Sequence, residues 1–448
     1  MAAWLLLLAV AVPVRAQSYD KLWKRVEQAE EKNLPKTVME VSDAIYRKAL
    51  AEQNAGQMMK AYLWREEAQY SLTPDSLYST IGKMEHWVQT EENAVNRAVL
   101  HVLLARLYLA ASSSVAGRTE GVLTPIELED APKDMREWTG NIFVWTIDRH
   151  LQQALADAEV LAETPSADYV PLVKQGKSSR YYGHDLYHVL LGYSLDDVYG
   201  NLGFTDSSDS LAQARVDSLL RTARTFYAGR RDGQDAALLF ALRYASWQLN
   251  ISQHRGDDKQ TQARYEQTLD SLMVHYADRP ICAEVYIWIA AFSETHKRPS
   301  EALRLCDEGL KRYASYERVD ELKNIRERIL NPNLSVSKVS GAYPGQTVDL
   351  NVSYRNLSGF TAEVYASTLS PSDERNSYRT VNSKEFRKYA GKRVSSVHYD
   401  LSPRPHEGVE PVDWTYLDSD TLLKLPVPEE VGVYLVRFIG DGKLADFG

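Results

Sequence analysis

The amino-acid sequence predicts a multidomain chain of 448 residues that is mostly α and then β: an α-solenoid followed by a seven-stranded antiparallel β-sandwich. Apolar residues recur at helical spacing from about residue 18 to residue 330. The segment Leu269–Asp278 recurs as Cys306–Ser315. After residues 331–333 the side-chain period falls to two, as in Val348–Tyr354. We therefore expect a leader peptide at 1–16, a helical solenoid at 17–331 and a β-sandwich at 332–448.

The first helices have clear start and stop signals. Asn33 ends the first, and Pro35 opens the second at a position where a first-turn proline is tolerated. Thr73-Pro74-Asp75 opens a later helix, and the apolar residues 94–111 predict an inner one. The apolar stripes of the first two helices are Leu22, Val26, Ala29, Val38, Val41, Ile45 and Ala49.

The middle of the chain is less regular. Small residues predict a loop at 112–132, one long helix follows at 138–163, and a connector follows at 169–182. Helical signal returns near His184, and glycines break it at 200–203. The buried candidates of the long helix are Ile142, Trp145, Ile147, Leu151 and Leu155.

The repeat indicates what kind of solenoid this is. Its period is close to the ~34 residues of tetratricopeptide repeats, and its content is helix, turn, helix. Such units cannot bury an apolar face singly, so neighbours must stack. The full consensus is absent, and we expect a tetratricopeptide-like array.

The carboxyl-terminal segment has the size of a seven-stranded sandwich. Pro332 ends the last helix, about 319–330, and separates two cores. In the first strand Val348, Leu350 and Val352 should face the core, and residues 369–392 read as a loop. The expected strands are 348–354, 362–366, 394–401, 421–425 and 433–438.

The amino terminus predicts export. Trp4–Val14 is a continuous apolar run, too short for the ~20 residues that a membrane-spanning helix needs, and small residues surround a cleavage point after Ala16. The segment before the run carries no Lys or Arg, which departs from the usual pattern. We expect a mature chain that begins at Gln17, lies in the periplasm or cell envelope or is secreted, and has no transmembrane segment.

Charge and cysteine content exclude some classes. A net charge of −9 without a Lys/Arg run argues against nucleic acid as a partner. Cys282 and Cys306 make neither a metal site nor a disulfide framework. Both fall on apolar helix positions, where they are either buried small side chains or one disulfide across a helix pair.

The segment His184-Asp185-Leu186-Tyr187-His188 places two histidines four residues apart, a spacing that zinc proteases use with a glutamate between them. Here aspartate replaces that glutamate, and no third ligand follows at a familiar spacing. Ordinary helix residues are the favoured interpretation. We therefore predict no catalytic, cofactor-binding or metal-binding residues, no cofactor and no enzyme activity.

Three further patterns carry little information. Asp446-Phe447-Gly448 matches a kinase motif in letters only, because the glycine-rich loop and the His-Arg-Asp loop are missing. Four glycosylation sequons begin at Asn250, Asn333, Asn351 and Asn356. Aromatic residues could form a glycan-stacking surface, but helical core spacing favours packing for Tyr62, Trp87, Trp145, Tyr244 and Trp247.

The β segment resembles the first macroglobulin domain of alpha-2-macroglobulin-like proteins. The first part of the resemblance is a Pro-Gly turn at Tyr343–Val348, followed by a strand at Asn351–Asn356. The second part is a domain-closing pattern of prolines and then an apolar strand, at Leu425–Pro428 and Val431–Val436. The helical part is similar to the amino-terminal extension of large bacterial members, at Tyr19–Glu27, Leu34–Thr37, the helix from Trp138 and Asp185–Tyr187.

The resemblance implies an endopeptidase inhibitor that traps proteases: a bait segment is cut, and a Cys–Gln thioester captures the attacker. Neither Cys282 nor Cys306 stands in the required Cys-X-Glu-Gln setting. The bait and thioester regions would follow Gly448, so this chain would be a non-catalytic amino-terminal portion with protein partners, proteases among them. The alternative is a stand-alone tetratricopeptide-like adaptor or glycan-binding protein of the cell envelope.

Overall fold

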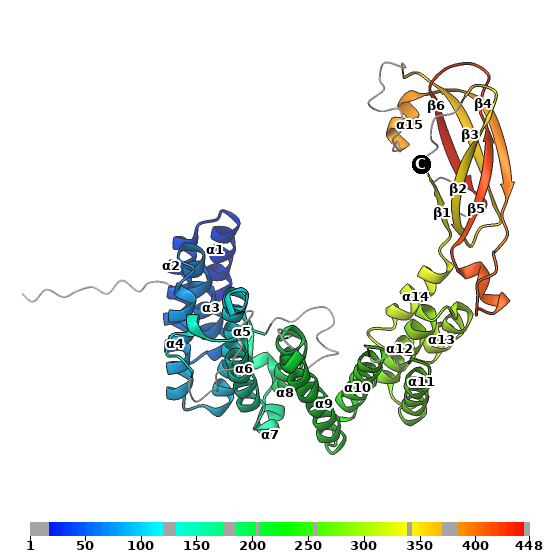
Figure 1. Cartoon of the computed structure of the whole chain (residues 1–448). Helices are drawn as coiled ribbons and strands as arrows, with labels where there is room; N and C mark the ends of the chain where they lie inside the picture. Colours follow the sequence, from blue (N-terminus) through cyan, green and yellow to red (C-terminus); the bar gives the residue numbers. More distant parts are fainter. Residues whose placement is uncertain are drawn as a thin grey trace, which may run out of the picture. The chain divides into compact units, whose positions relative to one another are not determined.

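The computed structural model describes residues 18–119, 131–173, 185–202, 206–254, 258–337, 343–369 and 383–442. The expected leader at 1–16 and the residues 446–448 lie outside this range. The described chain is helical up to Leu330 and β-rich afterwards, which confirms the α-then-β order (Figure 1). It divides into two compact units, of which the first ends at Trp247 and the second begins at Gln248.

The first unit is a series of antiparallel helices in which neighbours along the chain pack together, such as α1 with α2, α2 with α3, and α5 with α6. Asn33 takes a φ of 53°, a left-handed conformation that asparagine tolerates, and it ends α1 as predicted. The helices are α1 (Tyr19–Glu31), α2 (Pro35–Ala51), α3 (Ala55–Leu72), α4 (Ser76–Thr90), α5 (Ala94–Thr119), α6 (Gly140–Ala154), α7 (Ala158–Glu163), α8 (Leu186–Tyr193), α9 (Asp206–Ala228) and α10 (Gln234–His254), which runs into the second unit.

Two expectations for this unit are wrong. The predicted loop at 112–132 begins late, because α5 continues to Thr119. The predicted helix at 138–163 is two helices: α6 ends at Ala154, and Asp157, with φ −99° and ψ 59°, starts α7. Aspartate favours such a non-helical position before a helix over the interior of one. Of the buried candidates of that helix, only Trp145 remains partly exposed.

One helix of the described chain has the length and composition to cross a membrane, the segment Ala94–Ser113 in α5, with a mean hydropathy of 1.3. Half of that segment is buried within the protein, and α5 packs against α4 and α6. Core helices pass the same test. The absence of a transmembrane segment therefore stays a prediction.

The second unit begins with helical hairpins. Its helices are α11 (Asp258–His275), α12 (Ala283–Thr295), α13 (Pro299–Arg312) and α14 (Asp320–Leu330). The two copies of the repeated segment lie at the ends of α11 and α13, on either side of α12. They also touch: the Tyr313 hydroxyl donates to the carbonyl of Ala277, at 2.8 Å. The repeat in sequence is thus a repeat in space.

The β region contains two antiparallel sheets of three strands each, in the orders β1-β2-β5 and β4-β3-β6. Side chains from β1, β2, β3 and β5 join in one hydrophobic cluster, which includes Leu350, Val352 and Phe360. The strands are β1 (Asn333–Val336), β2 (Thr347–Arg355), β3 (Gly359–Ser367), β4 (Ala390–Asp400), β5 (Ser419–Pro426) and β6 (Tyr434–Gly440).

The β region differs from the expectation in two details, strand β1 and one short helix. The described residues form six strands, and a seven-stranded sandwich stays a prediction. Strand β1 was missed because it is only four residues long, and its burial pattern is too short to show alternation. Part of the expected loop at 369–392 is a short helix, α15 (Ser383–Tyr389). The inward placement of Val348, Leu350 and Val352 is confirmed.

Two side chains of the β region cap two helices of the same unit. The Asp413 carboxylate, in the 3-10 helix Pro411–Tyr416, accepts the backbone N–H of Ser300 in the first turn of α13, at 2.7 Å. The Asn356 amide donates to the carbonyls of Ile329 and Asn331 at the end of α14, at 2.7 and 3.3 Å. These bonds satisfy helix-end groups that have no partner inside a helix. The sandwich is therefore fastened to α13 and α14 by more than the connecting chain.

Replacing Asp413 with alanine is expected to lower the unfolding free energy of the second unit by about 1–2 kcal/mol, because a buried helix cap is lost. Chemical denaturation measures this, with Asp420→Ala as the matched control on an exposed position of β5. Equal stability of the two variants would show that the cap contributes nothing.

Candidate binding groove

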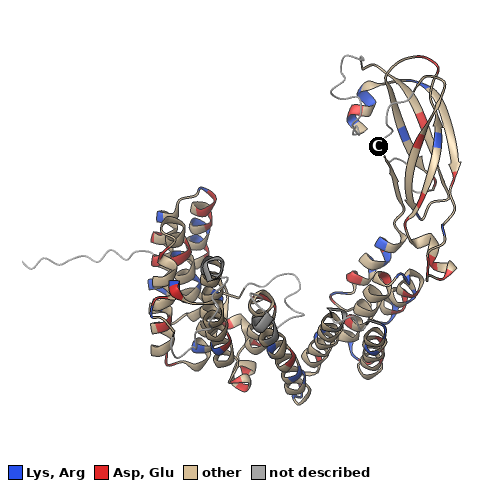
Figure 2. Cartoon of the chain, in the orientation of Figure 1, with Lys and Arg blue, Asp and Glu red and all other residues tan. Residues whose placement is uncertain are grey.

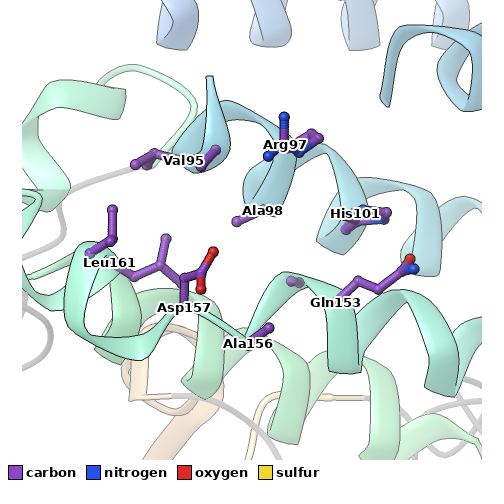
Figure 3. A pocket seen from close by; sticks show the side chains of 11 residues that line it. Val95, Arg97, Ala98, His101, Gln153, Ala156, Asp157 and Leu161 are labelled. Carbon is purple, nitrogen blue, oxygen red and sulfur yellow. The ribbon is translucent and has the colours of Figure 1, made fainter. Parts of the chain in front are cut away.

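Several polar side chains line one cavity of the first unit. This cavity, called the groove below, lies between the helices α5, α6 and α7 and has a volume of about 280 Å³ (Figure 3). Its floor is apolar, because Ala98, Ala154 and Leu161 are buried there. Ala156 and Asp157, which lie in the break between α6 and α7, are among its lining residues. The remaining lining residues are Ala94, Val95, Arg97, His101, Gln153 and Val160.

A chain of hydrogen bonds leads from the core to this groove. The Glu85 carboxylate accepts the Tyr108 hydroxyl at 2.8 Å and lies 3.0 Å from Nε2 of His150. His150 therefore donates from Nε2 and keeps Nδ1 as an acceptor. Nδ1 of His101 lies 2.9 Å from that Nδ1 and donates to it. Because Nδ1 of His101 carries the proton in this chain of hydrogen bonds, its Nε2 is an acceptor, and His101 lines the groove.

The protonation states agree with this order. Burial alone would raise the pKa of Glu85, but the hydrogen bonds from His150 and Tyr108 outweigh it and the pKa is lowered. Burial, and then the electrostatic influence of the neighbouring His150 ring, lower the pKa of His101 to about 4. Burial and the Glu85 charge raise the pKa of Tyr108. At neutral pH the carboxylate is charged, His101 is neutral and Tyr108 keeps its proton.

His101→Gln is expected to flatten the pH dependence of stability. The folded pKa of His101, about 4, lies below its ordinary 6.5, so the stabilisation is present above about pH 6.5 and is lost as the pH falls toward 4. The native chain should lose about 2 kcal/mol more unfolding free energy over this window than the variant does. Denaturation at pH 7 and pH 4.5 measures it.

His86→Gln is the control, because His86 is exposed on the neighbouring helix α4. It should leave the pH dependence unchanged. If the unfolding free energy fell equally with pH for the native chain and the His101 variant, the buried neutral histidine would be contradicted.

The groove suits recognition better than catalysis. A general base works best when its pKa is near the operating pH, and a pKa of about 4 makes His101 a weak one. The residues that line the described cavity include no serine, threonine, cysteine or lysine to serve as a nucleophile. What the groove offers is a carboxylate, a neutral acceptor nitrogen and an apolar floor, a combination typical of binding sites.

The structure describes the segment of His184 and His188, for which ordinary helix residues are the favoured interpretation, only from Asp185 onward. His184 lies outside the described residues. Asp185 caps α8: its carboxylate accepts the backbone N–H of His188 and the hydroxyl of Tyr227, both at 2.8 Å. His188 is buried, with its ring 4.7 Å from that of Phe240. Among the described residues no group of three or more His, Cys, Asp or Glu side chains could hold a metal ion.

The two cysteines are buried free thiols and not a disulfide. Burial, and then Asp307 and Glu294, raise the pKa of Cys306 to about 12, and burial also raises the pKa of Cys282. Both therefore stay protonated at neutral pH and act as small apolar side chains.

The sequons differ in their surroundings. Asn250 and Asn351 are exposed, whereas the amide of Asn356 caps α14 and that of Asn333 donates to Asp418 at 3.3 Å. A glycan on Asn356 would compete with the cap.

The aromatic residues proposed for packing do lie in or against the hydrophobic core, as predicted for Tyr62, Trp87, Trp145, Tyr244 and Trp247.

Sequence reasoning missed His101 and His150. They are 49 positions apart on α5 and α6, so no local spacing joins them. The available signal was weak: each histidine falls among the apolar residues of an inner helix, where a partner is needed.

A scan against protein-family models finds no match to this chain, and searches of curated proteins and of solved structures find none either.

Proposed function

We propose that this chain is a non-catalytic, extracytoplasmic interaction protein: the amino-terminal portion of an alpha-2-macroglobulin-like protein. In this proposal the helices form a tetratricopeptide-like array, and the β region is a seven-stranded macroglobulin domain. The implied role is protease inhibition by trapping, with the bait and thioester regions outside this chain. The groove of the first unit is the contact site for a protein partner.

The observation that carries the proposal is the junction between helices and sandwich. Asp413 and Asn356 of the β region form hydrogen bonds with the ends of α13 and α14, so side-chain contacts join the last hairpins to the sandwich. A protein that positions one domain for others needs such a joint. Figure 2 shows Lys and Arg interspersed with Asp and Glu along the helices, which suits protein contacts better than a polyanion.

The alternative of a glycan-binding adaptor has less support. Stacking on sugars requires exposed aromatic faces, and the tryptophans and tyrosines considered for that role pack against the hydrophobic core.

The experiment is an immunoblot of fractionated source cells, with an antibody raised against the second unit. The proposal predicts a polypeptide clearly longer than 448 residues in the extracytoplasmic fraction. Mass spectrometry of that band should find Gln17 as the first residue. A 448-residue cytosolic protein with Met1 intact would overturn both the proposed export and the proposed place in an alpha-2-macroglobulin-like protein.

A further inference from the structure

We infer that the groove between α5, α6 and α7 binds a lysine residue of a polypeptide partner. The lysine ammonium pairs with the Asp157 carboxylate, and a backbone N–H of the same peptide donates to Nε2 of His101. This inference rests on the proposed function only in taking the chain to be an interaction protein. It names the chemistry that the partner must carry.

The anionic end of the groove is Asp157. This residue precedes α7, but its side chain makes no capping hydrogen bond to the helix. Figure 3 shows the carboxylate pointing into the cavity from the α6–α7 turn. The side chain is exposed, so pairing with a cation requires little desolvation of the carboxylate. A hydrogen bond from an ammonium group to this carboxylate is charge-assisted and roughly twice as strong as a bond between neutral groups.

The other end of the groove offers a neutral acceptor. Nδ1 of His101 is engaged by His150, which leaves Nε2 for a ligand. A second cation is disfavoured at this end, because Arg97 lines the same cavity. The Arg97 guanidinium donates to the carbonyls of Glu91 and Glu92 at 2.7 and 3.2 Å, which holds its positive charge in place. A neutral donor such as a peptide N–H suits His101 instead.

An apolar strip separates the two acceptors. In Figure 3 Ala98 lies between Asp157 and His101, with Val95 and Leu161 toward the Asp157 end. Val160, 45% exposed, adds an unshielded apolar side chain at this end. Lysine fits this order, since its methylene stem can cover apolar surface while its ammonium reaches a carboxylate. A free diamine would carry a second cation toward Arg97, and a glutamate would meet Asp157 with like charge.

The experiment is calorimetric titration of the full chain with four probes. These are a capped Gly-Gly-Lys-Gly-Gly peptide, the same peptide acetylated on the lysine, the peptide with glutamate in place of lysine, and 1,5-diaminopentane. The lysine peptide should bind, and the acetylated and glutamate peptides at least about tenfold more weakly. Asp157→Asn should weaken lysine-peptide binding about tenfold, and His101→Phe about fivefold. Asp20→Asn, an exposed charge on α1, is the matched control and should change nothing.

Three results would overturn the inference. The diamine binding as tightly as the lysine peptide would make this a site for small amines. Tighter binding of the glutamate peptide would make it an anion site. No binding of the lysine peptide up to roughly 10 mM would leave no lysine site at all. None of these bears on the length or location of the chain in the cell, so the proposed function can survive them, and it can fail while peptide binding persists.

Discussion

Replacing Asp148 with alanine is expected to lower the unfolding free energy of the first unit by about 3–5 kcal/mol. The buried Asp148 carboxylate, on α6, joins three parts of the fold. It accepts the Tyr199 hydroxyl at 2.8 Å, and Arg215 of α9 at 2.8 and 3.0 Å through two nitrogens. It also accepts the Gln152 amide at 2.5 Å. Alanine would leave a buried hydroxyl and a half-buried guanidinium without this partner.

Asp217→Ala is the control for this experiment. Asp217 also pairs with an arginine, Arg221, but one helical turn away on α9 in a less buried position, where it also forms a hydrogen bond with Tyr244 of α10. Such surface pairs contribute at most about 0.5 kcal/mol. Urea denaturation followed by circular dichroism should separate the two variants clearly. Equal midpoints would show that the Asp148 network is dispensable.

Replacing Val352 with asparagine is expected to destabilise the second unit by roughly 2–4 kcal/mol. Val352 is 1% exposed, in the middle of β2, where it pairs with Val336 on β1 and Thr421 on β5. Its side chain lies in the cluster with Leu350 and Phe360. Asparagine is of similar size but would bury an amide without partners and remove apolar contact.

The control for Val352 is its exposed neighbour. Asn351→Asp changes charge on the outer face of the same strand and should have little effect. The structure also indicates which helices should lose stability together with the sandwich. Because Asp413 and Asn356 tie the sandwich to α13 and α14, those helices should lose stability with it, whereas the first unit should not. A single lowered transition for the whole chain would contradict the division at residues 247 and 248.

Much of the fold could be predicted because its signals are local. The stripe of Leu22, Val26 and Ala29 requires only helical spacing, and Pro332 ends α14 through its own geometry. Alternation placed Leu350 and Val352 inward without knowledge of the partner strands. Each of these features depends on neighbours in sequence.

What could not be predicted depends on residues far apart. The break at Asp157 looked like the interior of one helix, because apolar spacing continues across it. The caps from Asp413 and Asn356 join segments 113 and 27 positions apart, which no local pattern reveals. The groove is lined by residues that lie far apart in sequence, such as His101 on α5 and Asp157 before α7, so no local pattern could reveal it.

The most direct test of partner binding at the groove is site-specific photo-crosslinking in the source cells. A photoreactive residue is placed at Val160, on the groove, or at Val274, which is 79% exposed on α11 in the other unit. We predict a discrete crosslinked band from position 160 that weakens strongly when Asp157→Asn is introduced, and no such band from position 274. Identical bands from the two positions, or a band at 160 that ignores Asp157, would contradict a partner site in this groove.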